Sequence, residues 1–141
     1  LIKELVSLGA DCILLDYLHF PIDPTNSGDV KAVAGVSRAD ALVSFYGELK
    51  EHTGGVPMYV SISENAFNGG AEGNNAVQFG GDPATLGIDS WCISLNEPGL
   101  GASGLTLPQA PDKNIIYSLK GNTDNIPSTM KDVSYIVAEG N

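Results

Sequence analysis

The chain has 141 residues, a formal net charge of −10 and a hydrophobic content of 43%. Its length fits one globular unit, so we expect a single α/β segment over residues 1–141. The net negative charge repels phosphate backbones, so we do not expect nucleic-acid binding. No stretch of about 18 apolar residues is present, so we do not expect membrane insertion. The sequence opens in the middle of a helical pattern, from which we expect a segment of a longer chain. The localisation stays open, with an extracellular or cell-envelope position among the options.

The first two elements follow directly from hydrophobic spacing. Leu1, Leu5 and Leu8 fall on one helical face, and Gly9 is a natural end for that helix. A short, continuous apolar run then predicts a strand over 11–16. Such a run is typical of a strand that is buried on both faces of a parallel sheet.

A loop rich in turn-forming residues over 22–36 leads to the clearest helix of the chain. Ser37 is a good N-cap, and Asp40 is placed to complement the amides of the first turn. Gly54 and Gly55 end the helix. Its expected buried face consists of Leu42, Phe45, Tyr46 and Leu49.

The second half of the chain is expected to consist mainly of strands and irregular connections. A glycine- and asparagine-rich loop covers 65–75, and the tract 96–113 has no regular period. Asp82 resembles an N-cap with proline behind it, which predicts a short helix to about Leu86. We expect strands over 57–63, 90–95, 115–119 and 135–138, with a single helical turn over 128–132.

The alternation of helix and strand predicts βαβ units, and hence an α/β fold with parallel strands. A complete eightfold α/β barrel normally needs about 250 residues. We therefore expect a partial (β/α)8 barrel of the TIM type, cut from a longer barrel, with a small open α/β sheet as the alternative.

Asp16 is the first candidate for chemistry, because it follows the apolar run at the carboxyl end of a predicted strand. Parallel α/β folds assemble their sites at that edge, and a charge at the tip of a buried strand needs a partner or a substrate. The alternative is that Asp16 accepts hydrogen bonds from nearby loop amides.

The segment Gly9-Ala-Asp-Cys-Ile-Leu-Leu-Asp16-Tyr17-Leu-His19-Phe20-Pro21 resembles a strand of the putative bacterial glycoside hydrolases with an α/β barrel. That family carries Gly-x-Asp-x-Ile-x-x-Asp-Tyr-x-Arg-Phe-Pro at this strand. The likeness covers about residues 1–98 and weakens along them. It extends loosely to the Val-Ser-Ile-Ser run that ends at residue 63 and to the strand around residue 93. His19 replaces the family's arginine, so the substrate differs, the site is retuned, or it has decayed.

The resemblance implies hydrolysis of the glycosidic bonds of a polysaccharide, a reaction that usually needs two carboxyl groups flanking the bond. Asp16 is the expected nucleophile or charge stabiliser. Glu64 and Glu97 stand at the ends of the next two predicted strands and are candidates for its partner. The alternative for Glu64 is an exposed loop glutamate. Glu97 lies in an Asn-Glu-Pro tripeptide that also carries the acid/base in another large clan of barrel glycosidases.

Aromatic and polar side chains near these carboxylates are candidates for sugar contacts. Pyranose rings pack on aromatic faces, and His19 in its charged form would also favour the ionised form of Asp16. Phe20 and Trp91 have an alternative as core residues. The expected substrate-binding set is Tyr17, His19, Phe20, Trp91 and Asn96.

Neither a metal nor a cofactor is expected. Cys12 and Cys92 lack zinc-site spacing and are expected to be buried free thiols, and the glycines of 99–104 lack the lysine of a phosphate-binding loop. The leading hypothesis, which the resemblance implies, is a glycosidase. The alternatives are a non-catalytic carbohydrate-binding or cell-surface module derived from such a barrel, and a small α/β enzyme of unrelated chemistry.

Overall fold

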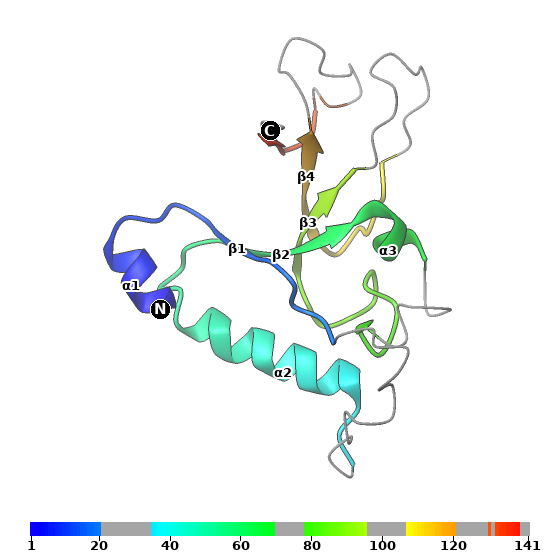
Figure 1. Cartoon of the computed structure of the whole chain (residues 1–141), viewed down its shortest axis with the longest axis horizontal. Helices are drawn as coiled ribbons and strands as arrows, with labels where there is room; N and C mark the ends of the chain where they lie inside the picture. The colour runs from blue at the N-terminus through cyan, green and yellow to red at the C-terminus, as the bar shows by residue number, and fades with distance from the viewer. Residues whose placement is uncertain (21–34, 70–77, 96–106, 121–129, 131, 139–141) are drawn as a thin grey trace.

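The computed structural model describes residues 1–20, 35–69, 78–95, 107–120, 130 and 132–138. Within these residues no helix is long and apolar enough to cross a membrane. The elements follow the chain as α1 (Ile2–Ser7), β1 (Ile13–Leu15), α2 (Arg38–Glu51), β2 (Met58–Ser63), α3 (Glu64–Asn68), β3 (Ser90–Ser94), β4 (Asn114–Lys120) and β5 (Tyr135–Ala138) (Figure 1).

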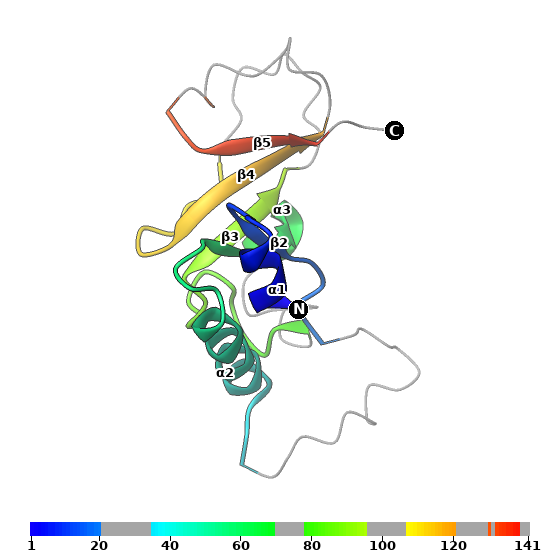
Figure 2. The same ribbon diagram turned by 90° about the vertical axis from the view of Figure 1, so that its left-hand side faces the viewer.

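The five strands form one sheet in which every neighbouring pair is parallel and the spatial order is β1-β2-β3-β4-β5. Figure 2 shows β5, β4, β3 and β2 in this order. An open doubly wound sheet reverses its strand order at a switch point, whereas this sheet keeps one direction and curls into a half-barrel. The expected α/β fold with parallel strands is therefore confirmed.

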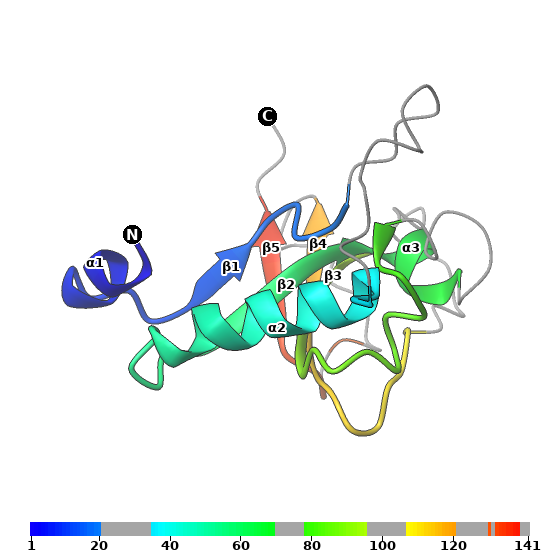
Figure 3. The same cartoon turned by 90° about the horizontal axis from the view of Figure 1, so that it is seen from below.

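Alternation along the strands divides the sheet into an apolar face and a more polar face. Met58, Val60 and Ile62 are buried, while Tyr59 and Ser61 between them are only half-buried. The register places Val60 beside Trp91 on β3. The apolar face packs against α2, which lies alongside the sheet in Figure 3, and continues into α3 and the loop before β3. The largest fully buried side chains are Trp91, Phe79, Ile88, Ile93 and Met130.

Helix α2 begins where its cap predicts. The Ser37 hydroxyl accepts a hydrogen bond from the Asp40 backbone N–H at 3.0 Å. Leu42 and Tyr46 are buried on the expected face, but Phe45 is 48% exposed. The predicted helix is confirmed, and its buried stripe is narrower than the hydrophobic pattern indicates, because only one side of α2 contacts the sheet.

Helix α1 forms as predicted but uses a different face. Leu1, Leu5 and Leu8 are exposed, and the side chains that pack against the core are Ile2 and Val6. The predicted buried face was therefore wrong. A helix of six residues has two apolar stripes here, and its orientation depends on tertiary contacts that hydrophobic spacing does not contain.

Three further local predictions need correction. Residues 64–68 form helix α3 rather than a loop, because the Ser63 hydroxyl accepts from the Ala66 N–H at 3.2 Å and Phe67 is buried on the core side. The turn at Asp82 does begin with a side-chain cap to the Ala84 N–H at 3.0 Å, but it is a single turn and not a helix. Cys12, expected to be buried, is exposed just before β1.

A polar cluster fixes α2 to the amino end of β3. The Tyr46 hydroxyl donates to Asp89 Oδ1 at 2.6 Å, the Ser90 hydroxyl donates to the same oxygen at 2.9 Å, and the Lys50 ammonium pairs with Oδ2. Burial on its own would raise the pKa of Asp89, but the hydrogen bonds from Lys50, Tyr46 and Ser90 outweigh it and lower the pKa to about 2.

This cluster predicts an acid-sensitive contribution to stability. The pKa of Asp89 is lower in the folded chain than its ordinary value of 3.8, so its contribution is present above about pH 4 and is lost as the pH falls towards about 2. The effect is moderated because the side chain is 44% exposed to solvent. Urea unfolding of the unmodified chain and of Asp89→Asn should give free energies that differ at neutral pH and converge in strong acid. An unchanged gap across that range contradicts the assignment.

Candidate functional site

A cavity of about 260 Å³ lies at the carboxyl ends of β1, β2 and β3. This is the edge at which parallel α/β folds assemble their sites. Three of the residues expected to form the site line it, and most of the remaining lining residues come from the ends of the next two strands or the segment around residue 78. The lining consists of Asp16, Tyr17, His19, Ser61, Ile62, Ser63, Ala66, Gln78, Phe79 and Ser94.

The chain turns sharply after β1, and this turn places the side chains of the site. Tyr17 is the one non-glycine residue of the described chain with a positive φ, at 57°. The His19 N–H donates to the Tyr17 carbonyl at 2.8 Å, and the Phe20 N–H donates to the Gln78 carbonyl at 2.8 Å. A left-handed conformation at a tyrosine is strained and is found disproportionately at functional sites. The strain thus occurs next to Asp16.

The His19 ring has one nitrogen committed to the backbone. Its Nδ1 lies 3.0 Å from the Phe20 carbonyl oxygen. A carbonyl oxygen can only accept, so Nδ1 carries the hydrogen and the neutral ring keeps Nε2 as an acceptor. The ring centroid of His19 lies 6.0 Å from that of Tyr17 and 5.9 Å from that of Phe79, so aromatic groups flank it.

The sequence interpretation missed the neutral polar part of this lining. Ser61 and Ser63 alternate with the buried residues of β2, and Ser63 pairs in register with Ser94 on β3. Period-two alternation in the sequence could have placed these hydroxyls on one face. Gln78 had no such signal, because only its loop contact with Phe20 brings it to the edge of the sheet.

Of the two candidate partners of Asp16, the structure describes Glu64. Glu64 is the first residue of α3, is half-buried, interacts with other residues and does not line the cavity. Asn96 and Glu97 lie outside the residues that the structure describes. Among the lining residues, Asp16 is therefore the one carboxylate.

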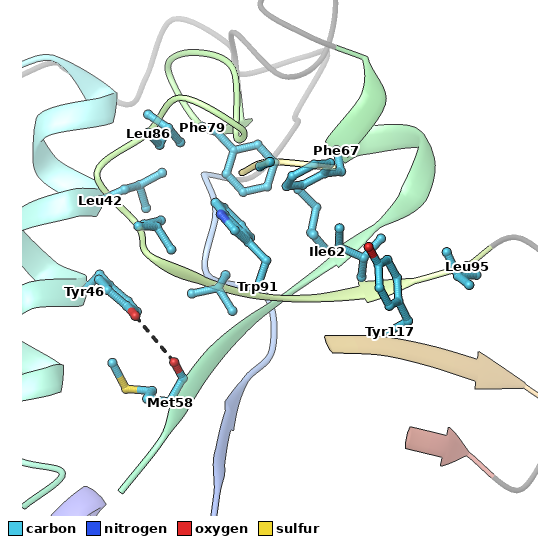
Figure 4. Packing of buried hydrophobic residues seen from close by; sticks show 14 of the residues in the cluster. Leu42, Tyr46, Met58, Ile62, Phe67, Phe79, Leu86, Trp91, Leu95 and Tyr117 are labelled. Atoms are coloured by element: carbon cyan, nitrogen blue, oxygen red, sulfur yellow. Dashed lines mark hydrogen bonds between the residues drawn. The ribbon is translucent and has the colours of Figure 1, made fainter. Parts of the chain in front are cut away.

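Trp91 does not reach the cavity. It is 0% exposed and packs edge-to-face between Phe67 and Phe79, with ring centroids 6.0 and 6.1 Å away (Figure 4). Its register position beside Val60 puts it on the apolar face, so the core alternative holds for this residue. Phe20 is half-buried against the same core, with the Arg38 guanidinium 5.4 Å from its ring centroid.

Cys92 lies on the same face as Ser61, since the two residues are in register. Burial, together with smaller effects of the nearby Cys12 and Asp16, raises the pKa of the Cys92 thiol to about 11. A thiol with a pKa in this range stays protonated at neutral pH and is a poor nucleophile. The carboxylate of Asp16 is therefore the better candidate for chemistry at this face.

No group of three or more histidine, cysteine, aspartate or glutamate side chains that could hold a metal ion occurs in the described part of the chain. Comparison of the chain with protein-family models, with curated proteins and with solved structures finds no match in any of the three. The fold and the cavity thus define a parallel α/β half-barrel with a polar site at its carboxyl edge.

Proposed function

We propose that this half-barrel is a glycoside-hydrolase-like domain that acts on a polysaccharide, with Asp16 as the carboxylate of the reaction. One observation supports this most strongly: Asp16, Tyr17 and His19 line a single cavity at the carboxyl edge of a parallel sheet. Asp16 and Tyr17 belong to the motif that carries the sequence resemblance to barrel glycoside hydrolases, and His19 stands where that family has an arginine. Sugar sites typically combine hydroxyl-rich walls, a carboxylate and an exposed aromatic ring, and all of these occur here.

The proposed fold is a part of a (β/α)8 barrel of the TIM type. Sequential strand order in an all-parallel sheet is the order of such a barrel. Parallel sheets are normally covered on both faces, yet Leu14 on β1 and Ile136 on β5 are both over 40% exposed. An apolar groove of about 670 Å³ along α1, β1 and α2 is also open. Further βα units would cover these surfaces.

In the proposed reaction Asp16 stays ionised and either attacks the anomeric carbon or stabilises the positive charge that develops there. A second carboxyl group protonates the leaving oxygen. Glu97 is the preferred candidate for this acid, because Glu64 belongs to the first turn of α3 and does not line the cavity. Tyr17 would supply a stacking surface for a sugar ring.

Asp16→Asn is expected to lower the rate of glycan cleavage by at least about 10²–10³-fold, the usual cost of removing one group that stabilises charge in the transition state. Because Asp16 is exposed, the free energy of unfolding should hardly change. The assay is the release of reducing ends from polysaccharides, with urea unfolding as the check on folding. Asp11→Asn is the control, since it removes an exposed carboxylate close in the chain that does not line the cavity. Undiminished cleavage by Asp16→Asn refutes the assignment.

A non-catalytic carbohydrate-binding role is the second candidate. It is favoured by the presence of one carboxylate among the described lining residues and by histidine in place of the family's arginine. In that case the unmodified chain is retained on a glycan affinity gel but releases no reducing sugar. Retention together with release supports the hydrolase instead.

A further inference from the structure

Resting on the proposed carbohydrate function, we infer that the cavity selects a sugar that carries a free ammonium group, such as a 2-amino hexose, over N-acetylated and anionic sugars. The arrangement of hydrogen-bond acceptors, the aromatic rings and the charge of the lining all indicate this class of ligand. Each is a property of the described residues.

The cavity presents several acceptors, and the side-chain amide of Gln78 is the lining group with obligatory donors. The carboxylate of Asp16 offers acceptors, and Nε2 of His19 accepts in the tautomer in which Nδ1 donates to the Phe20 carbonyl. The hydroxyls of Ser61, Ser63 and Ser94 can rotate to accept as well. An ammonium group has three donors and no acceptor, so it matches such a lining better than an acetamide or a carboxylate.

Aromatic rings near these acceptors also favour binding of a positively charged group. Tyr17 is 79% exposed and stands beside His19, and Phe79 lies on the other side of that histidine. The face of a tyrosine ring attracts a cation within about 6 Å of its centroid. A sugar ring that stacks on Tyr17 can therefore place an amino substituent near both the ring and the Asp16 carboxylate.

The charge of the lining opposes anionic sugars. No lysine or arginine is among the cavity-lining residues that the structure describes, and the chain as a whole carries −10. Sites for uronic acids or sulfated sugars use arginine or lysine to pair with the anion. Arg38, the single arginine of the sequence, does not line the cavity, and its guanidinium lies 5.4 Å from the ring centroid of Phe20.

The test uses the 141-residue chain and the monosaccharides glucosamine, N-acetylglucosamine and glucuronic acid, which contain no glycosidic bond to cleave. Binding is measured by NMR titration. Glucosamine should bind at least about tenfold more tightly than N-acetylglucosamine, the difference expected from one charge-assisted hydrogen bond, and glucuronic acid should bind weakest. Putrescine serves as a cation without a sugar and should bind more weakly than glucosamine.

Variants then locate the selectivity. Asp16→Asn should reduce the preference for glucosamine about tenfold, and His19→Phe should weaken glucosamine binding while keeping an aromatic ring. Asp11→Asn removes the same formal charge outside the cavity and should leave the preference intact. If Asp11→Asn also lost the preference for glucosamine, the selectivity would come from general attraction of a cation to an acidic protein, and the inference would be overturned.

The outcomes separate this inference from the function on which it rests. Equal binding of glucosamine and N-acetylglucosamine overturns the ammonium selectivity and leaves a carbohydrate site standing. Binding of putrescine as tight as that of glucosamine overturns selectivity for an amino sugar. If no glycan, neutral, aminated or anionic, binds or is cleaved by the unmodified chain, the proposed function itself fails.

Discussion

Replacing Trp91 by alanine is expected to reduce the free energy of unfolding by about 3–5 kcal/mol, the typical cost of truncating a large buried aromatic side chain. The indole is fully buried between Phe67 and Phe79, and it pairs in register with Val60 at the centre of the sheet. Its removal leaves a cavity at the junction of the sheet, α3 and the loop before β3. Urea unfolding followed by circular dichroism measures the change.

Trp91→Phe is the matched control. The indole Nε1 is buried and has no hydrogen-bond partner among the described residues, so its loss removes no bond that the structure contains. Phenylalanine keeps a ring and should cost clearly less than alanine. The core assignment is contradicted if Trp91→Ala unfolds with unchanged free energy and instead loses only affinity for glycans.

Replacing Gly80 by alanine is expected to destabilise the chain by about 2–5 kcal/mol. Gly80 has a φ of 74°, a conformation that costs other residues about 1–2 kcal/mol. An added Cβ would also overlap the Ala39 backbone nitrogen and lie 2.8 Å from the Arg38 Cβ, and overpacking of this kind adds about 1–3 kcal/mol. The clash would push the first turn of α2 away from Gly80, which follows the cavity-lining residues Gln78 and Phe79.

Gly47→Ala tests whether the effect is specific to this contact. Gly47 lies within α2, and nothing is found within 4 Å of an added Cβ. Alanine there should stabilise the chain by about 0.5–1 kcal/mol through helix propensity. Thermal unfolding of Gly80→Ala and Gly47→Ala, each compared with the unmodified chain, measures both changes in stability. Opposite signs support the close approach of Gly80 to α2, and a neutral Gly80→Ala refutes it.

Local signals in the sequence were sufficient for the strands and the main helix. The apolar run before Asp16 predicted β1, and the alternation of apolar and polar residues predicted β2. The Ser37 cap and the apolar spacing behind it predicted α2. Helix α3 was missed because its signal is one serine cap and one buried phenylalanine in a stretch otherwise typical of a loop.

The candidate site was only partly accessible to sequence reasoning. Asp16, Tyr17 and His19 were identified because they are close in the chain and follow an apolar run that predicts a strand, although Leu14 in that strand is exposed and not buried as expected. Gln78 was not identified, because its place depends on a backbone hydrogen bond to Phe20 across a long connection. Trp91 was assigned two alternatives, and burial in the folded chain selects the core.

The sequence by itself determined the α/β class, the parallel strands and the residues at the end of β1, since hydrophobic period and capping act between residues close in the chain. The tertiary structure alone decided which face of α1 is buried, which strands are neighbours and which distant side chains share the cavity. Those properties arise from packing between segments far apart in sequence, where a face or partner is selected by the surface it meets and not by local spacing.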